Sequence, residues 1–226
     1  MGRFIVIGII IQARMGSSRL PGKILKSIGG RPLLGHIFFR LSFLKHEVKT
    51  ILATSTSDKD DIVEIFCKEN NVTCFRGSEL NVLERYYSCA KQYSFDHVIR
   101  LTADNPFYDI EELDNLIDLH LTSGADYSHS FAYLPYGTGA EIFTFNALER
   151  SYKMGSQPNH IEHVNEYITD NSELFKIEVL SVSTEKNRPD IRLTVDTPED
   201  YEKMCFIAKY IGQEYIPIEA VIRHLS

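Results

Sequence analysis

The chain contains few cysteines, and they lack the spacing of disulfide frameworks or metal sites. Its 226 residues include four cysteines, none of them in a Cys-x-x-Cys pair. A chain of this length buries a sizeable core without such cross-links. Cys67 and Cys89 fall within helix-like patterns, where a free cysteine behaves as a small apolar residue. We therefore expect reduced thiols and a cytoplasmic protein.

Apolar runs long enough to cross a membrane are also missing. The run at the amino end, Phe4–Ile11, has eight residues before the polar Gln12. A membrane-spanning helix needs about 20 such residues. Because no small-residue cleavage site follows the run, we expect neither a signal peptide nor a membrane partner.

Basic residues are not in excess. The 24 Lys and Arg residues are outnumbered by 31 Asp and Glu residues, which gives a net charge of −7. A general nucleic-acid binder normally carries the opposite balance, so we expect no nucleic-acid partner. No repeat, low-complexity tract or linker divides the chain, and we predict a single domain over residues 1–226.

A basic loop directly after the first apolar run is the most informative feature that is present. The segment 12–23 contains two glycines, two serines and three cations. Glycines let main-chain N–H groups approach phosphate oxygens, while Arg14, Arg19 and Lys23 match the charge of a triphosphate. A solvated basic loop is the alternative. However, open α/β sheets bind ligands where their strands end, and this loop follows a predicted strand.

Strands and helices are predicted to alternate, which favours an α/β fold with a mostly parallel central sheet flanked by helices. The expected strands are 4–11, 48–54, 72–75, 96–101, 125–130, 141–145, 175–182 and 191–195. The expected helices cover 32–45, 58–66, 82–93, 110–121 and 161–169, with others starting near 146 and 198. Capping patterns predict helix starts at Ser57, Asp109 and Thr197.

Two aspartates share one local pattern: each follows a predicted strand and precedes a proline by two residues. They are Asp104 and Asp196. Aspartates at this edge of an open sheet point into the ligand crevice, and carboxylates suit Mg²⁺. Asp196 could instead help Thr197 to cap a helix, and Asp104 could cap a turn before Pro106. Together with a triphosphate-ready loop, the pair favours a metal site.

Three segments resemble the cytidylyltransferase family, which includes CMP-KDO synthetase and acylneuraminate cytidylyltransferase: Ile11–Lys23, Arg100–Pro106 and Leu193–Asp200. Three further blocks are similar to its spore-coat polysaccharide branch: Phe75–Ser78, Val82–Tyr87 and Glu162–Val164. The resemblance runs from residue 5 to about residue 200. It implies a GT-A-like (Rossmann-like) nucleotidyltransferase that uses CTP, Mg²⁺ and a small-molecule acceptor. Homodimers are common in the family, and the sequence permits one.

The resemblance also assigns roles to individual residues. Asp104 and Asp196 match metal positions, and they would be catalytic together with Arg14 and Lys23. The nucleotide-binding positions are Gln12 and Ala13 beside the base, Arg14, Gly16, Ser17, Ser18, Arg19 and Lys23 around the triphosphate, and Arg76, Arg85 and Arg100 facing the site. An acceptor oxygen would attack the α-phosphorus of CTP and release pyrophosphate.

We expect residues 131–180 to bind the acceptor or to form a dimer interface. The acceptor candidates are Glu141, Glu162 and His163, although the last two could be surface residues of a helix. Glu141 lies in Gly139-Ala140-Glu141, where the closest branch often has Asp-x-Glu, and Ile161 stands where Arg is frequent. These departures leave the acceptor open among sugar acids, sugar phosphates and related phosphorylated metabolites of surface polysaccharide biosynthesis.

Two other functions are considered. A glycosyltransferase of the same fold would need an Asp-x-Asp metal motif at its site. The nearest acidic groups here, Asp58-Lys59-Asp60 and Asp60-Asp61, lie at a predicted helix start. A non-catalytic nucleotide-binding subunit is the second alternative, and the presence of Lys23 and both aspartates argues against it.

Overall fold

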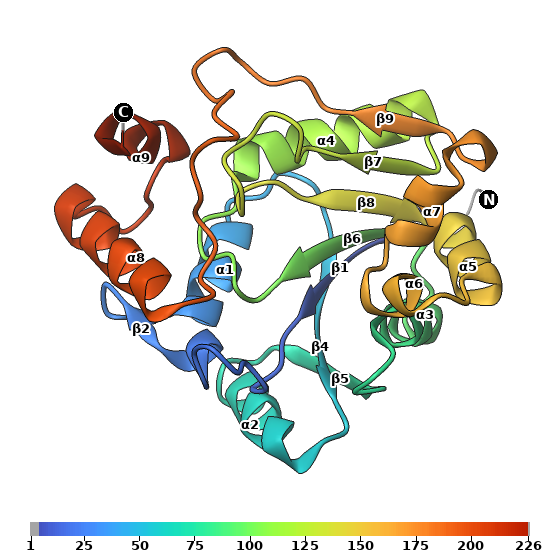
Figure 1. Cartoon of the computed structure of the whole chain (residues 1–226), viewed down its shortest axis with the longest axis horizontal. Helices are drawn as coiled ribbons and strands as arrows, with labels where there is room; N and C mark the ends of the chain where they lie inside the picture. Colours follow the sequence, from blue (N-terminus) through green and yellow to red (C-terminus); the bar gives the residue numbers. More distant parts are fainter. Residues whose placement is uncertain (1–4, 226) are drawn as a thin grey trace.

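The computed structural model describes residues 5–225 and contains a seven-stranded sheet with helices on both faces (Figure 1). The strands lie in the order β5-β4-β1-β6-β8-β7-β9. Their bounds are Ile7–Gln12 (β1), Lys49–Ser55 (β4), Thr73–Gly77 (β5), His97–Thr102 (β6), Tyr127–His129 (β7), Glu141–Thr144 (β8) and Ile177–Val179 (β9). Phe4, the first residue of the predicted amino-terminal strand, lies outside the described residues.

The sheet is mostly parallel, as predicted. β1 pairs in parallel with β4 and β6, β4 with β5, and β7 with β9. β8 pairs antiparallel with both β6 and β7. Within this sheet β8 therefore runs opposite to the other six strands. Parallel neighbours need a long crossover connection, usually a helix, whereas antiparallel neighbours such as β7 and β8 can be joined by a loop.

Helices cover both faces of the sheet, and the side chains of β1 pack against both helical layers. Ile9 and Ile11 pack in the core with α1, α2 and α4, whereas Ile10 packs in the core with α3 and α5. A strand buried on both faces needs a continuous apolar sequence.

The helix bounds are Leu33–Leu41 (α1), Asp61–Glu69 (α2), Val82–Gln92 (α3), Ile110–Ser123 (α4), Phe145–Met154 (α5), Pro158–Glu162 (α6), Glu166–Asp170 (α7), Pro198–Ile211 (α8) and Ile218–Leu225 (α9). Within residues 5–225, none of these helices has the length and apolarity required to cross a bilayer.

A third core cluster joins three segments that are far apart in the sequence. Leu20 from the basic loop, Phe107 after β6, and Val195 before α8 are all buried in it. The cluster also contains the inner faces of α8 and α9, which lie together at one end of the sheet (Figure 1). Burial of these apolar neighbours brings the loop, Asp104 and Asp196 to one place.

Some predicted elements differ from the structure. Residues 191–195 form no strand of the sheet; one isolated bridge joins Tyr136 to Arg192, and the apolar side chains of the segment pack in the third core cluster instead. The predicted helix 161–169 is divided between α6 and α7. Ser57 makes no side-chain cap and instead precedes the 3-10 helix η2, Asp58–Asp60. The caps at Asp109 and Thr197 are confirmed. The predictions did not include the hairpin of β2, Ser27–Ile28, with β3, Arg31–Pro32, or α9.

We expect Gly137→Ala to destabilise the fold more than Gly30→Ala. Both glycines have a left-handed backbone, with φ of 95° and 89°, and a side chain there costs roughly 1 kcal/mol or more. A Cβ at Gly137 would also lie 2.8 Å from the main-chain nitrogen of Thr194, whereas at Gly30 it meets nothing within 4 Å. Urea denaturation of both variants measures the difference. Equal losses of stability would contradict the close contact.

Candidate active site

A cavity of about 580 Å³ opens where β1 and β6 end. Its walls come from the basic loop, from the segments after β6 and before α8, and from residues 131–163. The lining residues are Gln12, Arg14, Ser17, Ser18, Arg19, Lys23, Ile24, Val82, Arg100, Thr102, Ala103, Asp104, Asn105, Tyr108, Phe131, Pro135, Tyr136, Gly137, Gly139, Glu162, His163, Thr194 and Asp196. This placement agrees with the rule that open α/β sheets bind ligands at the carboxyl ends of their strands.

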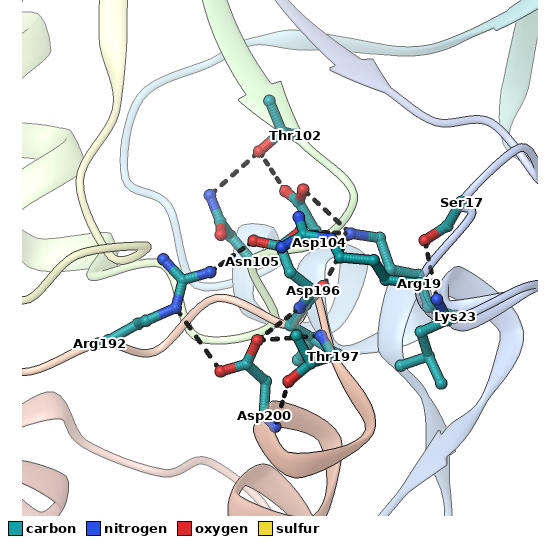
Figure 2. A network of polar contacts seen from close by, with 12 residues as sticks. Ser17, Arg19, Lys23, Thr102, Asp104, Asn105, Arg192, Asp196, Thr197 and Asp200 are labelled. Atoms are coloured by element: carbon teal, nitrogen blue, oxygen red, sulfur yellow. Dashed lines mark hydrogen bonds and ion pairs between the residues drawn. The ribbon is translucent and has the colours of Figure 1, made fainter.

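The lysine of the loop lies between the two predicted metal aspartates (Figure 2). Lys23 Nζ donates to Asp196 Oδ1 at 2.9 Å and to Asp104 Oδ2 at 3.3 Å, and also to the main-chain oxygen of Val195 at 2.7 Å. Gly22, with φ of 68°, turns the chain into the 3-10 helix η1, Lys23–Leu25, that carries this lysine. The two carboxylates therefore converge on one point.

The carboxylate of Asp196 takes no part in capping α8. Thr197 Oγ1 accepts from the Asp200 N–H at 3.2 Å, and Asp200 Oδ2 accepts from the N–H groups of Asp196 and Thr197 at 2.9 and 3.0 Å. The Asp196 carboxylate instead contacts Lys23 and accepts from Arg192 at 2.5 Å. Burial opposes ionisation, but these cationic donors outweigh it and lower the pKa of Asp196. The capping alternative for Asp196 is thus wrong.

Main-chain bonds and a hydroxyl fix Asp104. Its Oδ1 accepts from Thr102 Oγ1 at 2.6 Å, and its main-chain oxygen accepts from the Val195 N–H at 2.9 Å. One residue earlier, the Ala103 N–H donates to the main-chain oxygen of Gln12 at 2.8 Å. These bonds join all three sequence segments beside the cavity.

The pair of aspartates fits a hard divalent cation. Both carboxylates come within hydrogen-bond distance of one lysine nitrogen, so they can reach one cation. Residues 5–225 contain no group of three or more His, Cys, Asp or Glu side chains that could hold a metal by themselves. Mg²⁺ is commonly held by one or two carboxylates together with water and substrate phosphates. The donor set therefore suits Mg²⁺ shared with a nucleotide.

Most of the predicted nucleotide-binding residues line the cavity, and their binding roles remain predictions. Gln12, whose Oε1 is buried without a hydrogen-bond partner in the described residues, faces it together with the cations of the loop. Ala13 is buried and donates its N–H to the Ala53 oxygen, while Gly16 is exposed; neither belongs to the lining.

Arg76 and Arg85, expected to face the site, do not line the cavity. Arg76 donates to the main-chain oxygens of Ser55 and Ser57 and pairs with Asp61 and Glu64. These bonds attach the start of α2 to the end of β4. Arg85 is fully buried, and its Nη1 donates to the Ser78 oxygen at 2.6 Å. Both arginines thus bind neighbouring segments of the fold and do not face the cavity.

Glu141 is not the cavity residue that the sequence suggested. It is fully buried, accepts from Tyr127 Oη at 2.6 Å and pairs with Arg100, which does line the cavity. Strand register explains the pairing because Arg100 and Glu141 lie opposite each other on β6 and β8. Burial alone would lower the pKa of Arg100, but Glu141 raises it. Glu141 therefore orients Arg100 instead of contacting a ligand in this cavity.

The other two acceptor candidates, Glu162 and His163, do line the cavity and are exposed. Sequence reasoning missed Thr102, Asn105 and Phe131, which line it as well. The first two flank Asp104 within the second motif and could have been found by that position. Nothing in the local sequence distinguishes Phe131.

Comparisons with known proteins point to one family. The sequence model of the family described as cytidylyltransferase matches residues 8–213. The spore coat polysaccharide biosynthesis protein SpsF of Bacillus subtilis is 36% identical over 90% of this chain and 87% of its own, and the uncharacterized protein MJ1063 of Methanocaldococcus jannaschii is 37% identical over 98% and 90%. The solved structure of a cytidylyltransferase from Leptospira borgpetersenii is 34% identical, with a TM-score of 0.92 over 98% of this chain and 94% of that one.

Proposed function

The chain belongs to the cytidylyltransferase family of nucleotidyltransferases, and on this premise we propose that it transfers CMP from CTP to a small-molecule acceptor in surface polysaccharide or glycoconjugate biosynthesis. The acceptor class in this proposal is a sugar acid, a sugar phosphate or a related phosphorylated metabolite. The name of the Bacillus subtilis relative supports the choice of pathway class. The observation that carries the proposal is the convergence of Asp104 and Asp196 on Lys23, in a cavity walled by the basic loop.

In the proposed reaction, an acceptor oxygen forms a bond to the α-phosphorus of CTP while the bond to the oxygen bridging toward the β-phosphorus breaks. Pyrophosphate leaves with the electron pair, and a hydroxyl acceptor gives its proton to solvent. Such transfer depends on alignment and charge neutralisation. Arg14, Arg19 and Lys23 supply positive charge to the leaving pyrophosphate. Asp104 and Asp196 would hold Mg²⁺, which when bound neutralises phosphate charge.

We expect the purified protein to release pyrophosphate from CTP when Mg²⁺ and a correct acceptor are present. A coupled pyrophosphate assay over a panel of sugar acids and sugar phosphates measures this, with EDTA as the metal control. Melting-temperature shifts with CTP, UTP, GTP and ATP test the nucleotide preference, and CTP should give the largest shift. A protein that binds CTP and releases no pyrophosphate with any acceptor would favour the non-catalytic subunit.

A further inference from the structure

A buried carboxylate lies beneath the basic loop. Asp60, the last residue of η2, is 3% exposed. Its Oδ1 accepts from the main-chain N–H of Met15 at 2.7 Å. Its Oδ2 accepts from the Ser55 N–H at 3.3 Å and from the Ser55 hydroxyl. Met15 directly follows Arg14, so the bond fixes the loop beside one of its cations.

This contact lies where the loop leaves the sheet. β1 and β4 pair in parallel as far as Gln12 and Ala53, and the Ala13 N–H still donates to the Ala53 oxygen at 3.1 Å. Two residues farther along, the same ladder would join the N–H of Met15 to the oxygen of Ser55. That oxygen accepts from Arg76 Nε at 3.0 Å instead. The Asp60 carboxylate thus replaces the sheet as the acceptor for the loop.

The segment that carries Asp60 is itself braced. The Ser57 N–H donates to Ser55 Oγ at 3.1 Å, and Arg76 Nη2 donates to the Ser57 oxygen at 2.9 Å. Arg76 Nη1 also pairs with Asp61 at 2.6 Å. Contacts before and after Asp60 in the chain therefore hold its segment in place, so that the carboxylate can position Met15.

A carboxylate beneath a triphosphate site would repel its ligand unless its charge were balanced. Asp60 lies close enough to Arg85 to act on the Arg85 pKa: burial lowers that pKa, and Asp60 partly offsets the effect. Arg85 is fully buried, and its Nε and Nη2 have no hydrogen-bond partner within the described residues. Arg85 therefore places a buried positive charge near Asp60, whose carboxylate also accepts three hydrogen bonds.

We propose that Asp60 is a positioning residue for nucleotide binding: it holds the Met15 amide so that the loop presents Arg14 and its neighbours to the triphosphate. The inference rests on the proposed function because it takes the loop as the triphosphate site. Asp60 acts through Met15 and does not touch the ligand. It therefore affects the phosphate part of the nucleotide and not the nucleoside.

The test compares Asp60→Ala and Asp60→Asn with Asp58→Asn, an exposed aspartate of the same 3-10 helix. Calorimetry measures the affinity for CTP and for inorganic tripolyphosphate, and ligand-observed NMR measures the affinity for cytidine. We expect Asp60→Ala to weaken the binding of CTP and of tripolyphosphate by about tenfold, the equivalent of ~1.4 kcal/mol. The binding of cytidine should weaken by less than about twofold. Asp60→Asn, which can still accept from Met15, should lose less, and Asp58→Asn should match the wild type.

If Asp60→Ala lost equal affinity for tripolyphosphate and for cytidine and also had a lower melting temperature, Asp60 would have a structural role only. That result would overturn the proposal. Unchanged tripolyphosphate affinity in Asp60→Ala, or in Asp60→Asn if the alanine variant does not fold, would also overturn it. Failure of the proposed function would look different, because the wild-type protein itself would then show no preference for CTP or would release no pyrophosphate with any acceptor. Tripolyphosphate binding would still test Asp60 in that case.

Discussion

Asp196→Asn and Asp104→Ala should each lower the turnover number by roughly 10²-fold to 10³-fold or more while the fold stays intact. Both carboxylates are directed at Lys23 Nζ, and neither is needed to cap a helix. Each substitution would leave a divalent cation with a single carboxylate ligand. Pyrophosphate release at saturating CTP measures turnover, and electron paramagnetic resonance of Mn²⁺ with CTP measures metal binding directly.

Asp190→Asn is the matched control for this experiment. Its carboxylate pairs with Arg188 and does not line the cavity, so turnover and Mn²⁺ binding should both remain at the wild-type level. Near-normal turnover in Asp104→Ala would refute the metal role of that residue. Normal Mn²⁺ binding with lost turnover would assign the aspartate to orienting Lys23.

Glu141→Ala should reduce the free energy of unfolding by about 3–5 kcal/mol, because it leaves the guanidinium of Arg100 without its buried partner. Glu141 is fully buried, and Tyr127 would lose its acceptor as well. Glu162→Ala, at an exposed position of the cavity that Arg100 also lines, should change stability by less than about 0.5 kcal/mol. Urea denaturation without nucleotide measures all variants.

A second variant separates charge pairing from packing. Glu141→Gln keeps an acceptor for Arg100 but removes the charge. We therefore expect its free energy of unfolding to lie between those of the wild type and Glu141→Ala. In Arg100→Met/Glu141→Leu both charges are absent, and much of the lost stability should return, because apolar replacements of a buried pair are often nearly neutral. A loss below about 1 kcal/mol in Glu141→Ala would contradict the buried ion pair.

Much of the candidate site was predictable because its signals are local. The apolar run that became β1 predicts a strand buried on both faces, and the loop after it must then lie at the ligand edge of the sheet. Thr197 and Asp109 were identifiable as helix caps from their own few neighbours. The prediction for residues 191–195 was wrong because strand-like composition does not reveal whether a pairing partner is available.

Local sequence patterns were enough to predict the alternation of strands and helices, the basic loop and the two aspartates at strand-like ends. Each of these depends on residues within about one element of one another. By contrast, three contacts became visible in the folded chain alone: Glu141 pairs with Arg100, Arg76 braces α2, and Asp60 holds Met15. Such partners are set by strand register and by packing between segments far apart in the chain, which local composition does not encode.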